Sequence, residues 1–267
     1  MTASARIGAN LESLVENSFK AIDQGIYEIK QSPYTHDVIS LRKAITSCPH
    51  APLITEVKFS SPSRGSLRHN SMPADIANTM VRSGAIGISV LTQPYLFEGS
   101  PEYLGIIRKA ITNIPLLMKD IIVSTVQIDM GKHLGADCVL LIKTIFDRNM
   151  AEDSMEKLAD YATSKGLQVL VEVHKAQELA EVVKAGYDLV GINNRNLDNL
   201  EVDITYTEKL LKTQSKGTSI IISESGISEP ADIQFLRTAG ADAFLIGTSI
   251  MQAQDIGAKI AQLYNAL

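Results

Sequence analysis

The sequence lacks several features that would assign it to a specialised class of protein. It contains no tryptophan and only two cysteines, Cys48 and Cys138, and no run approaches the ~18 apolar residues of a membrane span. Cys138 lies within an apolar run, where a buried free thiol is expected, so a disulfide framework is excluded. Residues 1–10 carry no basic segment followed by an apolar one, which predicts a cytoplasmic protein.

An excess of positive charge is also missing. The chain has 25 Lys and Arg against 30 Asp and Glu, a formal net charge of -5. Binding to nucleic acid or to an anionic membrane requires clustered basic residues, so we expect neither partner. The five histidines show no metal-ligand spacing, and no GlyXaaSerXaaGly or AspXaaAsp motif occurs. We therefore expect no metal, and any anionic ligand must be held by local groups.

What the sequence does contain is a repeated unit. Short apolar runs rich in β-branched residues are each followed by a turn and a segment with helical periodicity. The predicted strands cover residues 52–58, 86–91, 115–119, 137–142, 168–173, 188–192, 219–224 and 242–246. Helical patterns between them include 74–83, 102–111, 154–165, 175–185 and 229–239. Most of these helices end at the glycine expected at a helix C-terminus, namely Gly84, Gly166, Gly186 and Gly240.

This alternation of strands and helices indicates a parallel sheet. Eight regular repeats without a dinucleotide-binding glycine fingerprint after the first strand favour a closed (β/α)8 TIM barrel. A doubly wound open sheet would give the same local pattern and is the alternative. We expect residues 1–267 to form a single TIM-barrel domain, with the barrel at 51–267 and an N-terminal helical extension at 1–50.

The extension has apolar residues at helical spacing, which predicts one or two extra helices packed on the barrel: Leu11, Leu14, Val15, Phe19, Ile22 and Ile26. The pattern leaves two positions open, a cap on the bottom of the barrel or a place over the active site. The loop at 60–73 is long and rich in small polar residues, so it could close over a ligand.

Charged and amide side chains stand at the ends of several predicted strands: Glu56, Lys58, Lys119, Glu172, Asn193, Arg195 and Glu224. In TIM barrels the catalytic groups project from these strand ends. Six charges dispersed through a core would cost several kcal/mol each, whereas charges gathered at one mouth compensate one another. A polar catalytic centre is the favoured interpretation, and structural ion pairs along the barrel rim are the alternative.

A phosphate site is predicted from the last two loops. TIM barrels often bind phosphate with glycine-bearing loops after their seventh and eighth strands, where backbone N–H groups face the anion. Here Ser225–Ile227 and Ile246–Ser249 occupy those two loops. Either segment alone would be weak evidence, because a glycine after a strand is usually only a turn.

Six motifs resemble, in order and spacing, those of the indole-3-glycerol phosphate synthase family. They are GluValLysPheSerSerProSerArgGly (56–65), LeuMetLysAsp (117–120), ValGluValHis (171–174), GlyIleAsnAsnArgAsnLeu (191–197), SerGluSerGlyIle (223–227) and PheLeuIleGlyThrSer (244–249). The resemblance runs from about residue 50 to the C-terminus. Ile121 and Ser60 depart from the family, which often has Phe and Ala there.

The resemblance implies a cofactor-free reaction. The family converts 1-(2-carboxyphenylamino)-1-deoxyribulose 5-phosphate into indole-3-glycerol phosphate, carbon dioxide and water. By resemblance, Lys119 protonates the ketone oxygen, Lys58 binds the substrate carboxylate while Glu56 fixes its ammonium, and Glu172 takes part in dehydration. How Lys119, Lys58 and Glu172 divide the proton transfers is left open.

The predicted sites follow from these roles. The catalytic set is Lys119, Glu172, Lys58, Glu56 and Asn193; the substrate-binding set is Arg195, Glu224 and Ser225; the phosphate-binding set is Ser61, Gly226, Gly247 and Thr248. Two other functions are alternatives: a Schiff-base aldolase using Lys119, and a catalytically silent sensor of a phosphoribosyl ligand. We expect a phosphorylated small-molecule substrate and a monomer, with an oligomer as the alternative.

Overall fold

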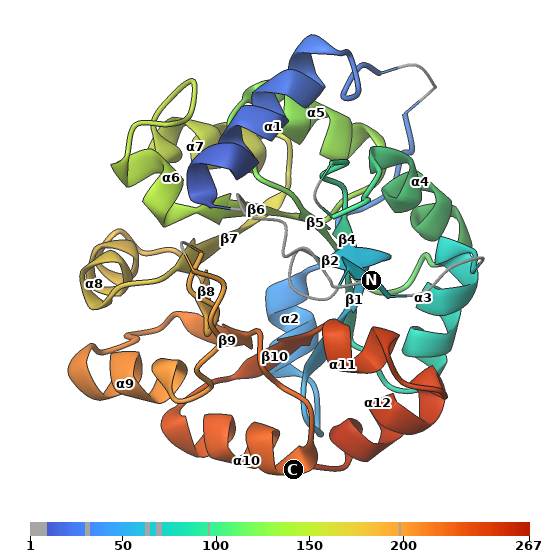
Figure 1. Cartoon of the computed structure of the whole chain (residues 1–267), viewed down its shortest axis with the longest axis vertical. Coiled ribbons are helices and arrows are strands. Elements are labelled where there is room, and N and C mark those ends of the chain that lie inside the picture. Colours follow the sequence, from blue (N-terminus) through green and yellow to red (C-terminus); the bar gives the residue numbers. More distant parts are fainter. Residues whose placement is uncertain (1–9, 30–32, 62–64, 68–70, 96, 198) are drawn as a thin grey trace, which may run out of the picture.

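The computed structural model describes residues 10–29, 33–61, 65–67, 71–95, 97–197 and 199–267. Its centre is a closed ring of eight parallel strands in the order β1-β10-β9-β8-β7-β6-β5-β4 (Figure 1). They are β1 (Leu53–Val57), β4 (Gly87–Leu91), β5 (Leu116–Lys119), β6 (Cys138–Ile142), β7 (Gln168–Val173), β8 (Leu189–Asn193), β9 (Ile220–Glu224) and β10 (Ala243–Ile246). The closed barrel is confirmed, and the open sheet is excluded because β1 pairs with both β10 and β4.

Helices surround the ring of strands (Figure 1). They are α3 (Pro73–Arg82), α4 (Pro101–Ala110), α5 (Thr125–His133), α6 (Lys143–Asp147), α7 (Met155–Ser164), α8 (Ala176–Lys184), α9 (Tyr206–Thr213), α10 (Pro230–Ala239), α11 (Thr248–Met251) and α12 (Ile256–Tyr264). The glycine that ends α10, Gly240, has φ +109°, a left-handed conformation that side chains with a Cβ rarely adopt. No helix in the described part of the chain is long and apolar enough to cross a membrane.

Strand alternation divides the core into two hydrophobic clusters. In β6, Cys138, Leu140 and Ile142 belong to the cluster inside the barrel, whereas Val139 and Leu141 belong to the cluster that includes the surrounding helices. Because side chains two residues apart share a face, the last inward residue of each strand lies at the barrel mouth. The sixth strand ends one residue later than predicted, so Asn193 is its final residue.

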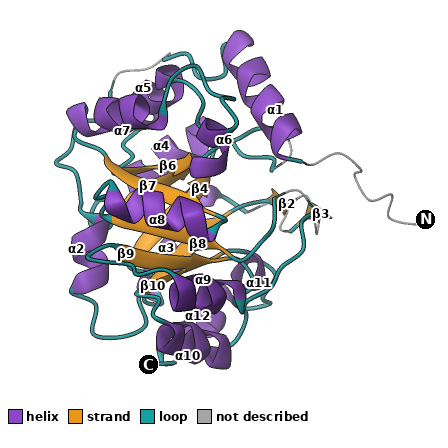
Figure 2. Cartoon of the chain, turned by 90° about the vertical axis from the view of Figure 1, so that its left-hand side faces the viewer, coloured by secondary structure: helices purple, strands orange, loops and turns teal. Residues whose placement is uncertain are grey.

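The N-terminal extension occupies both positions that the sequence left open. Helix α2 (Leu41–Thr46) lies at the N-terminal end of the strands, where the Leu41 N–H donates to Gln168 Oε1 at the start of β7. Helix α1 (Leu11–Asp23) lies at the opposite end of the barrel, on the side of β2 and β3 (Figure 2). One helix therefore caps the bottom, and the other stands beside the mouth.

The loop after β1 contains a short antiparallel pair, β2 (Ser60–Ser61) with β3 (Gly65–Ser66). The pair projects from the mouth of the barrel on the same side as α1 and α11 (Figure 2). The N–H of Leu67 donates to the carbonyl of Phe59 at 2.8 Å, which extends this hairpin toward β1.

A buried ion pair fastens the extension to the barrel. The guanidinium of Arg108, on α4, is fully buried and pairs with Asp137 at the start of β6. The Asp137 carboxylate also accepts the N–H groups of Leu116 and Ile39, each at 2.8 Å, and lies 2.8 Å from His36 Nε2. Every oxygen of this carboxylate is engaged, which a buried charge requires.

We predict that Arg108→Met lowers the free energy of unfolding by roughly 3–5 kcal/mol, because it leaves the Asp137 carboxylate buried without its main partner. Urea unfolding followed by circular dichroism measures this loss. Arg42→Met serves as the control, since Arg42 forms an exposed pair with Asp188 worth less than about 1 kcal/mol. Equal losses in the two variants would contradict the assignment of Asp137 as the anchor.

Candidate active site

A cavity of about 480 Å³ opens at the C-terminal ends of the strands. The predicted site residues that line it are Glu56, Lys58, Lys119, Glu172, Asn193, Arg195, Glu224, Ser225, Gly226, Gly247 and Thr248. The backbone of Ser61 lies in β2, and its side chain is outside the described part of the structure. One cavity thus contains groups from six strand ends and the loops after them. They meet because the strands close into a ring.

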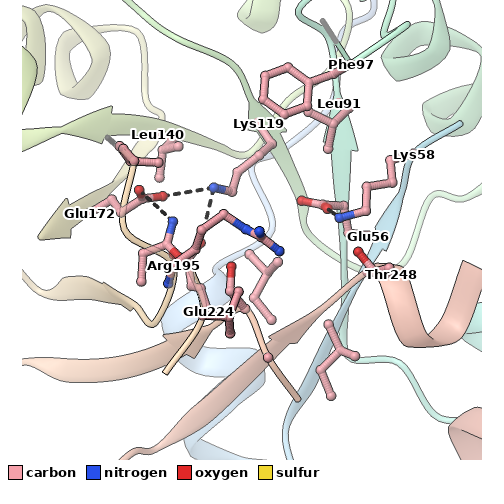
Figure 3. A pocket seen from close by; sticks show the side chains of 18 of the residues that line it. Glu56, Lys58, Leu91, Phe97, Lys119, Leu140, Glu172, Arg195, Glu224 and Thr248 are labelled. Carbon is pink, nitrogen blue, oxygen red and sulfur yellow. Dashed lines mark hydrogen bonds and ion pairs between the residues drawn. The ribbon is translucent and has the colours of Figure 1, made fainter. Parts of the chain in front are cut away.

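Lys119 stands at the centre of the charged groups. Its Nζ is 2.9 Å from Glu172 Oε2 and 3.1 Å from Glu224 Oε2. The lysine side chain is 15% exposed, whereas the two glutamates are 1% and 2% exposed. The ammonium therefore contacts two carboxyl groups that have almost no contact with solvent. Figure 3 shows Lys119 between them.

A further contact sets the orientation of Glu172. Asn193 donates from Nδ2 to Glu172 Oε1 at 3.0 Å, so the two carboxylate oxygens have different partners. Asn193 is itself fixed, because its Oδ1 accepts the backbone N–H of Arg195 at 3.0 Å. The strand ends of β5, β7 and β8 are thus joined by one chain of hydrogen bonds.

Burial and mutual attraction act in opposite directions on these groups. Burial alone lowers the pKa of Lys119, but Glu172, Glu224 and Glu56 outweigh it and raise that pKa above the ordinary lysine range. For Glu172, burial raises the pKa, and Lys119 together with His174 and Asn193 brings it below the usual value. Burial raises the pKa of Glu224, and the negative charge of Glu172 raises it further. Lys119 and Glu172 are therefore ionised, and Glu224 holds a proton more readily.

A second charged pair lies across the cavity from Lys119 (Figure 3). Lys58 Nζ is 2.8 Å from Glu56 Oε1, and Ser89 Oγ donates to the other oxygen of Glu56 at 3.3 Å. Glu56 is an inward residue of β1, and Lys58 follows the end of the strand by one residue. Their spacing of two residues brings both side chains to the mouth, where Lys58 faces the cavity.

Close backbone approach shapes the last two loops. A Cβ at Gly247 would lie 2.6 Å from Glu56 Oε1 and 2.9 Å from Lys58 Nζ, so only glycine leaves room for that pair. Ser225 and Gly226 both have positive φ, at +67° and +85°. Gly247 precedes α11, whose first amides have no acceptor within the helix. Amide groups of both loops thus border the cavity at one side.

The loop after β8 is held by a buried asparagine that the sequence did not single out. Asn194 donates to Ser223 Oγ at 3.1 Å and to the Ser225 carbonyl at 3.0 Å. Its Oδ1 accepts the N–H and the hydroxyl of Thr207 at 3.0 and 2.8 Å. Nothing about Asn194 in the sequence distinguished it from the neighbouring Asn193, because its partners come from other elements.

Comparison with known proteins agrees with this geometry. A family model described as indole-3-glycerol phosphate synthase matches residues 6–263. The chain belongs to the indole-3-glycerol phosphate synthase family. Its relatives include the indole-3-glycerol phosphate synthase of Polaromonas sp. (strain JS666), 41% identical over 86% of this chain and 85% of the relative. The enzyme of that name from Campylobacter jejuni is 39% identical over 86% of each chain.

Solved structures show the same fold at lower identity. Thiamine phosphate pyrophosphorylase from Pyrococcus furiosus has a TM-score of 0.60 at 15% identity, covering 85% of this chain and 97% of that one. A 3-hexulose-6-phosphate synthase has a TM-score of 0.60 at 18% identity, covering 81% and 99%. The family assignment confirms the predicted activity class, a carboxy-lyase of tryptophan biosynthesis that acts on a phosphorylated small molecule.

One wall of the cavity is apolar, and the sequence did not predict it. Its members are Leu14, Leu91, Phe97, Ile121, Leu140, Ile142 and Leu197. Leu14 comes from α1, so the N-terminal extension contributes to the site of this indole-3-glycerol phosphate synthase family member. In the sequence, Leu14 is marked only by helical periodicity. That pattern predicts a buried helix face, but it does not predict which part of the barrel the face contacts.

Asp120, the residue after Lys119, is a further buried group to which the sequence pattern gives no role. Its carboxylate accepts hydrogen bonds from Tyr27 (2.9 Å), from Thr92 and from the N–H of Ile121 (2.7 Å). Burial raises the pKa of Asp120 to about 6, although these hydrogen bonds oppose that rise. Asp120 thereby joins the extension to the loops after β4 and β5, directly beside Lys119.

Gly191, the first residue of the motif at 191–197, leaves room for the side chain of Glu224. It faces inward on β8, and a Cβ there would collide with Glu224 Oε1. We predict that Gly191→Ala displaces Glu224 from Lys119 and lowers the kcat of the family's ring-closure reaction by about 10- to 100-fold, with the fold retained. Steady-state kinetics and circular dichroism measure the two effects.

Gly87→Ala is the matched control, because Gly87 is also a strand glycine but its Cβ would meet only Leu41 and Pro115, at 3.3 Å or more. That variant should keep its kcat. A Gly191→Ala variant with unchanged kcat would show that the position of Glu224 does not matter.

We predict that Lys119→Met makes stability depend on pH in a new way. Without the ammonium, burial raises the pKa of Glu172 above the unfolded value of about 4.3 and raises the pKa of Glu224 further than in the unaltered protein. A carboxyl group whose pKa is raised by folding stabilises the fold below its unfolded pKa, and this contribution is lost as pH rises. The Tm of the variant, relative to the unaltered protein, should therefore fall between about pH 5 and 8.

Lys157→Met provides the comparison, since Lys157 forms an exposed pair with Asp153. Its Tm should follow that of the unaltered protein at every pH. If Tm falls and rises with pH in Lys119→Met as it does in the unaltered protein, then Lys119 does not control the pKa values of the two glutamates.

Proposed function

We propose that the protein catalyses the decarboxylating ring closure of 1-(2-carboxyphenylamino)-1-deoxyribulose 5-phosphate to indole-3-glycerol phosphate, with release of carbon dioxide and water. The observation that carries the proposal is the placement of Lys119 between two buried glutamates, opposite the Glu56–Lys58 pair, in one cavity. This arrangement offers an acid, a base and a separate cation for the substrate carboxylate.

Lys119 is the proposed acid for ring closure. As the aromatic carbon attacks the ketone, the carbonyl bond breaks toward oxygen, and that oxygen takes a proton from the ammonium. The raised pKa of Lys119 keeps the ammonium as the resting form at neutral pH. Glu172 and Glu224 hold the nitrogen in place, so the proton is presented from a fixed position.

Lys58 is the proposed site for the substrate carboxylate. Its ammonium is held by Glu56 and lines the cavity, and a carboxylate beside it would gain a charge-assisted hydrogen bond. The apolar wall that contains Phe97 and Leu140 offers a surface for the aromatic ring. Together these groups would set the ring carbon against the ketone before any proton moves.

Glu172 is the proposed base for dehydration, with Asn193 orienting its carboxylate. The lowered pKa of Glu172 keeps it ionised and able to accept a proton from the nitrogen end of the substrate. Arg195, Glu224 and Ser225 line the same side and would bind the sugar hydroxyls. Gly226, Gly247 and Thr248, with Ser61, would hold the phosphate through the last two loops and the start of α11.

We also propose that residues 1–267 act as a single domain and as a monomer. One chain supplies the acid, the base and the substrate cation, so no partner group is needed to complete the site. The helices of the extension pack at the two ends of the barrel, which supports one folding unit. Two free cysteines, one of them buried, suit the reducing cytoplasm.

The test is the fluorescence of the indole product after addition of the carboxyphenylamino-deoxyribulose phosphate. We expect the unaltered protein to form product and Lys119→Met to lose about 10²- to 10⁴-fold in kcat, the usual contribution of a general acid. Lys157→Met controls for the loss of a lysine elsewhere and should keep full activity. Absence of product with the unaltered protein would refute the proposed reaction.

A further inference from the structure

His174 lies two residues beyond Glu172 at the end of β7, so the two side chains leave the strand on the same side. His174 Nε2 is 3.3 Å from Glu172 Oε1, the oxygen that faces away from Lys119. The backbone of His174 is fixed at both ends. Its N–H donates to Glu178 Oε2 at 2.7 Å, and its carbonyl accepts the hydroxyl of Tyr206. The ring is therefore held beside the proposed base by contacts that do not involve the ring itself.

The imidazole is buried without hydrogen bonds of its own. Its side chain is 12% exposed, and within the described residues neither ring nitrogen has an aligned hydrogen-bond partner. Buried polar atoms are nearly always hydrogen-bonded, because desolvation without a partner costs free energy. We therefore expect water to bind the ring nitrogens, and a ring bound to water can exchange protons with it.

His174 lines a second cavity of about 320 Å³. Its polar lining includes Thr144, Arg148, His174, Lys175, Asn196, Glu201, Asp203 and Tyr206. It shares Asn193, Arg195 and Leu197 with the substrate cavity, so the two cavities are separated by a single layer of side chains. This volume and lining can hold several waters within reach of His174.

The proposed reaction requires a proton from outside the substrate. The ketone oxygen leaves as water and takes up two protons, while the N–CH2 unit of the substrate gives up one. Loss of carbon dioxide from the carboxylate involves no proton, so each turnover consumes one proton from solvent. Both protons must reach the oxygen while substrate fills the larger cavity, which Lys119 lines.

We propose that His174 delivers this proton from solvent in the second cavity to Glu172, which passes it to Lys119. The inference rests on the proposed function, because the proton count is that of the ring closure. In the transfer, the N–H bond at His174 Nε2 breaks and its electrons stay on nitrogen, while an O–H bond forms at Glu172. Glu172 then protonates the Lys119 amine, 2.9 Å from its other oxygen, and water in the second cavity reprotonates the imidazole.

The charges around the ring fit this role. On its own strand it faces Glu172, and Glu178 of α8 binds its backbone. The second cavity is also lined by Arg148 and Arg195, by Glu201 and Asp203 in the loop before α9, and by Lys175, which directly follows His174. Charged side chains of both signs therefore line the cavity that His174 borders.

The experiment compares His174→Gln and His174→Ala with Lys175→Gln, a control that removes a neighbouring charge from the same cavity. We expect each histidine variant to lose roughly 10- to 100-fold in kcat with less than about a twofold change in KM. The loss should be smallest at acidic pH, where solvent protons are abundant. Added imidazole should restore kcat to His174→Ala, whereas sodium chloride at equal ionic strength should not. Lys175→Gln should match the unaltered protein.

The outcomes separate the two proposals. If the unaltered protein forms no product, the proposed function fails. If it forms product and the histidine variants keep their kcat and pH profile, the relay is wrong. A uniform loss at every pH without imidazole rescue would make His174 a structural residue and would also overturn the inference.

Discussion

The site is organised around one ammonium group buried against two carboxylates. Lys119 shares its charge between Glu172 and Glu224, which are almost inaccessible to water. Removing charges from water is costly, and it is tolerated here because three strand ends bring the partners within hydrogen-bond distance. Closure of the barrel is what makes this possible, since β5, β7 and β9 are far apart in sequence and meet only around the ring.

The same constraint explains why many groups at the mouth have fixed partners. Asn193 donates a hydrogen bond to Glu172, and Glu56 forms an ion pair with Lys58. Asp120 accepts hydrogen bonds from donors in three segments. A charge held in this way loses little freedom when substrate arrives, which is how preorganised sites reduce the cost of reaching the transition state. The apolar wall at the same mouth lowers the local dielectric and strengthens each of these contacts.

Much of this arrangement could be predicted from sequence because it is periodic. The strands were placed within a residue or two, since each is a short apolar run followed by a turn, and Glu56, Lys58, Lys119 and Glu172 broke the pattern where strands end. The pattern does not predict that Leu14 lines the cavity, that Asn194 holds the loop after β8, or that a hydrogen-bond network surrounds Asp120. Their partners lie in distant segments, and no local pattern records a contact that only the closed ring creates.

The N-terminal extension binds to residues of the barrel that are synthesised much later than the extension itself. Ile39 and His36 bind Asp137, about a hundred residues further along the chain, and the Leu41 N–H binds Gln168. About a hundred residues or more must therefore be synthesised after these N-terminal segments before their binding sites exist. The extension can therefore dock only after β6 and β7 have been made, and the cavity that Leu14 lines is completed only when β10 and the loop after it have joined the ring.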